Sequence, residues 1–336
     1  MLRRHFLKRI LRRYLARYSL FRTDKSSTLN SIAFGSCNRT HLPQPLWSHI
    51  ISRQPDIFLW LGDAVYADTT DPEKMQREYQ KQLSMPDYIA LRNSTPVVGI
   101  WDDHDYGGNN LGKENPIRQQ SQQLFLDFVD EPADSARRAQ KGVYTSYVFG
   151  AEAQQVKLIL LDTRYHRERP GKGRANLLGK AQWRWLENEL KTTTAQVNLI
   201  ASSFSVLSTQ IPRAEEWDDY QWEKRRLFRL IKKHRVSGVL FLTGDRHFAA
   251  HLSEKASGRR YHELMSSGMT HYLKRSYISR LFKHYYGVKN SYFGINFCML
   301  EFDWSDPVRI RFCVYAKNNT LQLERRLSLI DGFWSI

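Results

Sequence analysis

Residues 95–110, TPVVGIWDDHDYGGNN, place three carboxylates, one imidazole and two carboxamides directly after an apolar run. A short, almost continuous apolar run that ends in a polar turn predicts a strand buried on both faces. Any polar turn would satisfy the need for solubility at the end of such a strand. The concentration of side chains that can bind metals or move protons therefore marks this strand end as a candidate functional site.

Three other apolar runs end in residues of the same kind. IAFGSC ends in Cys37, DIFLWLGD ends in Asp63, and GVLFLTGDRH carries Asp245 and His247 at its end. In an open α/β sheet the carboxyl ends of the strands line the ligand crevice, so we expect these side chains to converge. Each residue taken singly also fits an ordinary turn or core position, but four such strand ends together indicate shared ligand chemistry.

Convergent carboxylates repel one another, and bound cations remove that repulsion. Carboxylate, carboxamide and imidazole groups suit Ca, Mn, Fe or Zn, whereas the thiolate of Cys37 and the phenolate of Tyr66 favour iron or zinc. The strand ends therefore predict a site for two metal ions, one bound by harder ligands and one by softer ligands.

The organisation of the chain indicates one α/β domain, residues 29–336, behind an N-terminal extension, residues 1–28. Strands and helices alternate as far as residue 245 and strands dominate after it, which favours helices outside two packed sheets over a closed eightfold barrel. The expected helices cover residues 73–83, 117–129, 179–191 and 219–234. The expected strands cover residues 31–36, 56–62, 96–101, 143–150, 156–162, 197–204, 238–244, 262–268, 297–302 and 308–316.

The chain is strongly basic, with 51 Lys and Arg against 34 Asp and Glu and a net charge of +17. Residues 1–22 carry eight of the basic residues and no acidic one, and their apolar residues recur at helical spacing. Such a basic amphipathic helix is typical of binding to an anionic membrane surface. A helix packed on the flank of the domain and an organelle transit peptide are the alternatives.

The location expected from the sequence is the cytoplasm, with peripheral binding to a membrane. The N-terminal segment has no uninterrupted apolar core of a secretory signal, and it lacks the ~20 apolar residues of a membrane span. The three cysteines, Cys37, Cys298 and Cys313, are too scattered for a disulfide framework. No specific protein partner is expected.

Taken together, the quoted segments resemble the PhoD-like alkaline phosphatase family of the metallophosphoesterase superfamily. The resemblance implies a four-layer α-β-β-α sandwich, two metal ions, Fe and Ca with Mn or Zn as alternatives, and hydrolysis of phosphate monoesters or diesters. One departure is that the superfamily places a ligand histidine after the strand at 197–204, where this chain has none. The matching segments are FGSCNR (34–39), LGDAVYAD (61–68), VVGIWDDHDYGGNN (97–110), LLDTRYHR (160–167), LLGKAQWRWLENEL (177–190) and LTGDRHFAAH (242–251).

The resemblance also implies a set of metal ligands. Cys37 corresponds to the thiolate ligand, Asp63 to the carboxylate that bridges both metals, and Tyr66 to the tyrosinate ligand of iron. Asp102 can exchange roles with Asp103, and Asn110 with Asn109. The complete expected set is Cys37, Asp63, Tyr66, Asp103, Asn109, Asp245 and His247.

Three further residues are expected to act on the substrate. His104 is expected to protonate or stabilise the leaving oxygen, and Asp105 is left as a residue that orients His104. Arg39 and Arg164 are expected to hold the phosphate oxygens, although each also fits a structural ion pair. The reaction expected is attack on a phosphate ester by a hydroxide activated by the two metals.

The basic surplus favours a polyanionic or lipid-borne phosphorylated substrate. The segment 270–290, THYLKRSYISRLFKHYYGVKN, is basic and aromatic, and it fits a cover over the crevice, a lipid contact or an ordinary surface loop. Two competing hypotheses stay open: a metal-dependent nuclease on the same fold, and a non-catalytic protein that binds membrane or nucleic acid and holds a structural metal.

Overall fold

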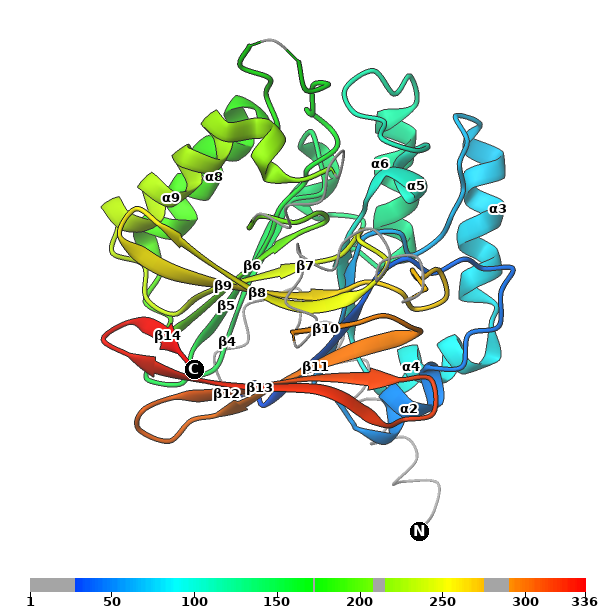
Figure 1. Cartoon of the computed structure of the whole chain (residues 1–336). Coiled ribbons are helices and arrows are strands. Elements are labelled where there is room, and N and C mark those ends of the chain that lie inside the picture. The colour runs from blue at the N-terminus through cyan, green and yellow to red at the C-terminus, as the bar shows by residue number, and fades with distance from the viewer. Residues whose placement is uncertain (1–27, 172, 208–214, 275–289) are drawn as a thin grey trace.

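The computed structural model describes residues 28–171, 173–207, 215–274 and 290–336. These residues form two seven-stranded sheets that pack face to face, with helices on their outer faces (Figure 1). The predicted α/β class with two packed sheets is confirmed. Residues 1–27 lie outside the described residues, and so does most of the expected N-terminal helix.

Both sheets are mixed. Strands β1, β2 and β3 are parallel to one another, and so are β5, β6, β7 and β9. In spatial order the first sheet contains β14 (Phe333–Ser335), β13 (Leu321–Ile330), β12 (Arg309–Ala316), β11 (Asn296–Asp303), β1 (Ser31–Gly35), β2 (Ile57–Leu61) and β3 (Val97–Ile100). The second contains β10 (Ser291–Tyr292), β8 (Ala249–Ala256), β9 (Arg259–Ser266), β7 (Val239–Thr243), β6 (Val197–Ser202), β5 (Val156–Leu160) and β4 (Thr145–Phe149).

The helices divide between the two sheets. In the chain, α2 (Trp47–Ser52), α3 (Pro72–Leu83), α4 (Pro86–Ser94), α5 (Asp103–Tyr106), α6 (Arg118–Phe128) and α7 (Ala136–Ala139) lie between β1 and β4. Helix α8 (Gly179–Thr192) joins β5 to β6, and α9 (Gln221–Lys233) precedes β7. The helix expected at 219–234 begins as a 3₁₀ turn over Trp217–Tyr220. The other three expected helices are confirmed to within about one residue at their ends.

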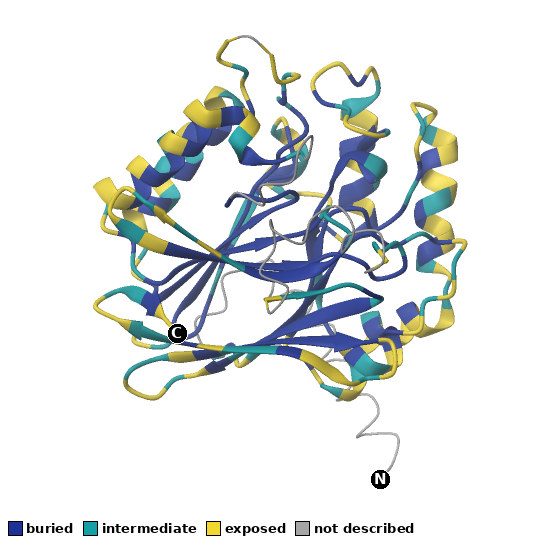
Figure 2. Ribbon diagram, in the orientation of Figure 1, coloured by how far each residue is buried: buried dark blue, intermediate teal, exposed yellow. Residues whose placement is uncertain are grey.

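The core follows from the alternation of side chains along each strand. Phe34 and Leu59 of the first sheet belong to one buried cluster with Leu158 of the second sheet, which fills the space between the sheets. Residues at the alternate positions, such as Trp60, pack instead against the helices outside the sheet. Figure 2 shows the result, with buried residues on the strands and exposed residues on the outward sides of the helices.

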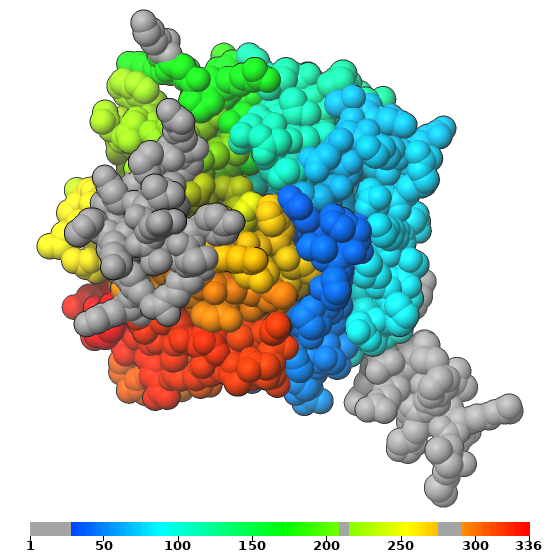
Figure 3. Space-filling model, turned by 45° about the vertical axis from the view of Figure 1, so that its right-hand side comes forward, coloured from blue at the N-terminus to red at the C-terminus, as the bar shows by residue number. Residues whose placement is uncertain are grey.

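The carboxyl ends of the parallel strands of both sheets meet at one edge. The chain after β9 returns to this edge, where the backbone N–H of Met269 donates to the carbonyl oxygen of Ser36 at 3.0 Å. The segment after β1 and the segment after β9 therefore lie side by side, although more than 200 residues separate them (Figure 3). Strand ends that are remote in the sequence thus share one site.

A buried histidine pair joins the neighbouring strands β8 and β9. The Nε2 atom of His251 shares a hydrogen bond of 2.9 Å with Nδ1 of His262, and Nε2 of His262 lies 3.1 Å from the carbonyl oxygen of Trp334 in β14. The two rings are stacked and buried. The pair therefore ties the C-terminal strand to the middle of the chain.

The histidine pair generates a prediction about acid stability. Burial, with His262 and Arg325 nearby, lowers the pKa of His251 to about 3, whereas the unfolded chain protonates this ring below its ordinary pKa of 6.5. The neutral, buried form of His251 therefore costs no free energy of unfolding above pH 6.5. Below pH 6.5 the free energy of unfolding falls by about 1.4 kcal/mol per pH unit, because the unfolded chain binds a proton that the folded protein does not. We expect urea unfolding of His251→Phe to depend less steeply on pH between 6.5 and 4.5. The exposed His41→Phe is the control, and equal pH slopes for His251→Phe and wild type would contradict the prediction.

Candidate active site

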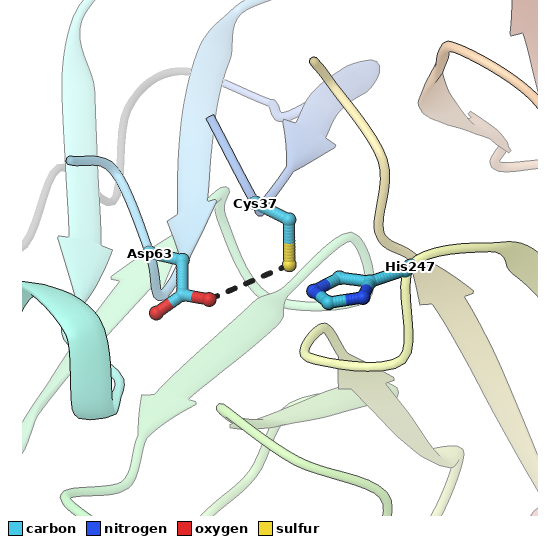
Figure 4. Close-up of side chains that lie close together, drawn as sticks. All are labelled: Cys37, Asp63 and His247. Carbon is cyan, nitrogen blue, oxygen red and sulfur yellow. Dashed lines mark hydrogen bonds between the residues drawn. The ribbon is translucent and has the colours of Figure 1, made fainter. Parts of the chain in front are cut away.

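Three strand ends bring Cys37, Asp63 and His247 to one point (Figure 4). Cys37 follows β1, Asp63 follows β2 in the same sheet, and His247 follows β7 in the opposite sheet. The Sγ atom of Cys37 lies 3.5 Å from Oδ2 of Asp63, and one ligand atom from each of the three residues lies within 4.8 Å of the others. A thiol, a carboxylate and an imidazole at such distances form a donor set that suits iron or zinc.

Asp63 also belongs to a second group of ligand atoms. One atom each from Asp63, Asp103 and His104 lies within 4.8 Å of the others. Asp63 is therefore common to a sulfur-containing group on one side and a carboxylate-rich group on the other. This position fits the expectation that its carboxylate bridges two metal ions.

The backbone at these strand ends is in an unusual conformation. Cys37, Asp63, Asp245 and His247 all have φ between 50° and 65°, the left-handed region that residues other than glycine rarely adopt. Clusters of such conformations are typical of functional sites. The side chains of three of these residues, Cys37, Asp63 and His247, lie close together (Figure 4).

The glycine before Asp63 is required by close packing. Gly62 has a φ of 96°, and a Cβ atom added to it would lie 2.5 Å from the Cβ of Asp102. A side chain at this position would therefore push the end of β2 away from the end of β3, which carries Asp102. The Gly-Asp pair in this motif reflects the close approach of two strand ends.

The acidic groups of the site are buried at a cost in free energy. Burial and the charges of neighbouring aspartates raise the pKa of Asp63 well above its ordinary value. Burial likewise raises the pKa of Asp105 to about 7 and that of Asp245 to about 6, and it raises the pKa of the Cys37 thiol. Groups that resist ionisation in the metal-free protein become stable ligands when a cation supplies the missing charge. The residues present therefore fit a metal centre.

The structure separates the roles of Asp102 and Asp103. Asp103 lies with Asp63 and His104, and its Oδ2 accepts a hydrogen bond of 2.6 Å from the backbone N–H of Asn110. The Oδ1 of Asp102 instead accepts hydrogen bonds of 2.6 Å from the Oγ of Ser203 and from Arg164. Of the two alternatives that the sequence left open, Asp103 is the one that lies with Asp63.

His104 is oriented by a residue that the sequence analysis missed. Its Nδ1 lies 2.6 Å from Oδ1 of Asp68, and its ring stacks on Tyr66 at 4.1 Å between centroids. The expectation that Asp105 orients His104 is wrong, because the carboxylate of Asp105 accepts hydrogen bonds from the backbone N–H groups of Asp102 and Ala64. Asp68 is the last residue of the segment LGDAVYAD. Nothing in the sequence indicates that Asp68 contacts His104, which lies 36 residues further along the chain.

Tyr66 and the remaining expected ligands lie around these groups. The Tyr66 hydroxyl lies 3.4 Å from Nε2 of His247, whereas Asp245 lies in neither three-residue group, although its charge acts on Asp63. Asn109 is exposed and lines a pocket of about 420 Å³ together with Arg167.

The comparison with known proteins decides the family. The sequence pattern described as PhoD-like phosphatase matches residues 32–286, which is most of the chain. The chain belongs to this family. The resemblance drawn from the sequence motifs is thereby confirmed.

Two relatives illustrate the extent of the likeness. Alkaline phosphatase D of Bacillus subtilis (strain 168) is 23% identical in an alignment 269 residues long, and the match covers 65% of this chain and 46% of that protein. The chain thus spans about half the length of the curated relative that it matches. A solved structure of PhoD superposes with a TM-score of 0.66 at 20% identity, over 92% of this chain and 73% of the solved chain. This second likeness shows a shared fold.

In this member of the PhoD-like family, Arg164 does not have the position expected of a phosphate-binding residue. Its side chain is fully buried, its Nε donates to Asp102, and its two terminal nitrogens donate to Glu215. Glu215 also pairs with Arg167, whose Nη1 donates to the carbonyl oxygen of Asn110. Arg164 therefore has the structural ion pair that was its alternative role: each of its three side-chain nitrogens contacts a carboxylate, and the expectation that it holds phosphate oxygens is not met.

Arg39 is the arginine that faces the site. Its guanidinium lies 4.9 Å from the ring centroid of Tyr66, and its buried Nε has no hydrogen-bond partner among the described residues. The backbone N–H of Arg39 donates to Oγ1 of Thr270, which fixes the start of the side chain. Of the two arginines expected to hold phosphate oxygens, only Arg39 keeps that role as a prediction.

The buried position of Arg164 generates a prediction about stability. Arg164→Leu leaves Asp102 without its buried cationic partner and leaves Glu215 with Arg167 alone, and breaking a buried pair in this way costs about 3–5 kcal/mol. We expect urea denaturation of the metal-free protein to show this loss at pH 8 and a smaller loss at pH 5, where the Asp102 carboxylate can take up a proton. Arg39→Leu, which removes no ion pair among the described residues, should change the free energy of unfolding far less. Equal stability of Arg164→Leu and Arg39→Leu would contradict the account.

Proposed function

We propose that this protein is a metal-dependent phosphoric ester hydrolase of the alkaline phosphatase or phosphodiesterase type. The observation that carries the proposal is the position of Asp63, which lies with Cys37 and His247 on one side and with the carboxylate of Asp103 on the other, where His104 is the neighbouring proton donor. Membership of the PhoD-like phosphatase family supports the same activity. The proposed substrate is a phosphorylated compound, polyanionic or lipid-borne, because the net charge of +17 attracts such molecules.

The proposal assigns a metal-binding role to the converging side chains. When bound, two metal ions would supply charge neutralisation at the phosphoryl group and a water molecule of lowered pKa. The softer group fits Fe or Zn and the carboxylate-rich group fits Ca or Mn. The residues that would hold the ions are Cys37, Asp63, Asp103 and His247 of the two groups and Tyr66 beside His247, with Asn109 and Asp245 assigned on the family resemblance alone.

His104 is proposed as the general acid that protonates the leaving oxygen. Burial alone would lower the pKa of His104, but the hydrogen bond to Asp68 and the charge of Asp103 raise it above its ordinary value. The imidazolium form therefore persists to higher pH than in an ordinary histidine, and its Nε2 carries the proton for the leaving group because Nδ1 faces Asp68. A structural metal site requires no such proton donor, so this pair favours catalysis over a purely structural site.

Arg39 is proposed to hold the free oxygens of the phosphate. A guanidinium presents a planar set of N–H donors that matches phosphate oxygens. Arg39 is half-buried beside Tyr66, and among the described residues its side chain is committed to no carboxylate. It can therefore direct its N–H groups to a substrate that lies over Asp63.

A hydrolysis assay tests the proposed function. Protein loaded with Fe, Ca, Mn or Zn should hydrolyse a chromogenic phosphate monoester or its diester, and the ratio of the two rates should reveal which ester class is preferred. Asp63→Asn should abolish turnover, because one carboxylate serves both groups of ligands. The matched control is Asp87→Asn, an exposed aspartate of α4. Turnover that survives chelators, or full activity of Asp63→Asn, would contradict the proposal.

The dependence of the rate on the leaving group tests the role of His104. His104→Asn should lower kcat by about 10²–10⁴-fold on an alkyl phosphate ester, whose leaving oxygen needs a proton. The loss should be much smaller on a nitrophenyl ester, which leaves without protonation. Asp68→Asn should show the same pattern with a smaller amplitude. A loss that is equal for both esters would exclude proton donation by His104.

A further inference from the structure

The segment after β9 brings a histidine to the site that no motif predicted. After Gly268 the chain runs beside the end of β1, and the backbone N–H groups of Thr270 and His271 donate to the carbonyl oxygen of Cys37 at 3.2 and 3.0 Å. The backbone N–H of Leu273 donates to the carbonyl oxygen of His247 at 2.7 Å. His271 is thus fixed beside Cys37 and His247, two of the expected ligands, by main-chain hydrogen bonds.

The side chain of His271 makes two contacts with the site. Its Nδ1 shares a hydrogen bond of 3.1 Å with the Tyr66 hydroxyl, and its ring centroid lies 3.9 Å from that of His247. The ring is half-buried, so it is held on one side and reaches the crevice on the other. His271 therefore contacts Tyr66 and His247 at the same time.

Tyr66 depends on neighbouring rings for its orientation. One face of its ring stacks on His104, and the edge-to-face contact with His271 has an interplanar angle of 74°. The phenol oxygen has two imidazole nitrogens near it, Nε2 of His247 at 3.4 Å and Nδ1 of His271 at 3.1 Å. If Nε2 of His247 binds a metal ion, it is no longer available to the Tyr66 hydroxyl. Nδ1 of His271 is then the remaining imidazole partner of the phenol oxygen.

We propose that His271 is a positioning residue that holds the phenol oxygen of Tyr66 toward the group formed by Cys37, Asp63 and His247. The proposal rests on the proposed function, because it assigns Tyr66 and His247 to a metal centre. His271 acts through Tyr66 and is not itself assigned to the metal or the substrate. Partners that orient metal ligands typically contribute 10–100-fold to metal affinity.

The test measures the affinity of the protein for Zn²⁺ by competition with a chromogenic chelator. His271→Phe keeps a ring against His247 and removes the hydrogen bond to Tyr66, so its dissociation constant for Zn²⁺ should rise about 10–100-fold. His271→Gln, whose amide can reach the phenol oxygen, should recover most of this loss. His41→Phe, an exposed histidine near Arg39, should bind Zn²⁺ like wild type. Circular dichroism verifies that each variant is folded.

The possible outcomes distinguish the two proposals. Wild-type affinity in both His271→Phe and His271→Gln would overturn the positioning role and leave the metal centre intact. Equal losses in the two variants would also overturn it, because a role in packing alone predicts no rescue by glutamine. A wild-type protein that binds no Zn²⁺ and hydrolyses no ester would overturn the proposed function, and the role of His271 with it.

Discussion

The structure depends on one electrostatic constraint: several carboxylates are buried together at the edge where the two sheets meet. Asp63, Asp102, Asp103 and Asp105 all lie within this buried region. The protein itself supplies only part of the compensating charge, through Arg164 behind Asp102 and the backbone N–H groups that bond Asp105. Burial and the neighbouring aspartates still raise the pKa of Asp63, and this is the feature that makes a bound cation the expected partner of the fold.

The topology explains how residues from distant parts of the sequence meet at this edge. Parallel strands place all their carboxyl ends on one side, so β1, β2 and β3 deliver their following residues together. Strand β7 of the opposite sheet adds His247 from across the interface between the sheets. The backbone after β1, β2 and β7 is left-handed at Cys37, Asp63, Asp245 and His247, whereas it is extended at Asp102 after β3, and the hydrogen bonds of the segment after β9 link the ends of the two sheets.

Sequence patterns were informative where one local rule decides the structure. Continuous apolar runs predicted the central strands, and their polar ends predicted which strand ends would carry the site. Strands β8 and β13 were missed because exposed charged residues interrupt their apolar pattern, as in LQLERRLSLI. Helices α2 and α4 were missed because they are short, so their periodicity gives little signal.

The contacts within the site were harder to predict, because they depend on long-range geometry. The pairing of Asp68 with His104 spans 36 residues, and the contact of His271 with Tyr66 spans 205. The role of Arg164 required knowledge of Glu215, which comes from a different strand connection. In each case the residue type was compatible with several roles, and only the fold selects among them.

Anomalous scattering from crystals grown with Mn²⁺ tests the central claim most directly, because it locates cations without reference to activity. The account predicts anomalous density beside the carboxylate of Asp63, on the side of Asp103 or on the side of Cys37 and His247, and its loss in Asp63→Asn crystals. Well-diffracting crystals of the wild-type protein with no anomalous density beside Asp63 would contradict it.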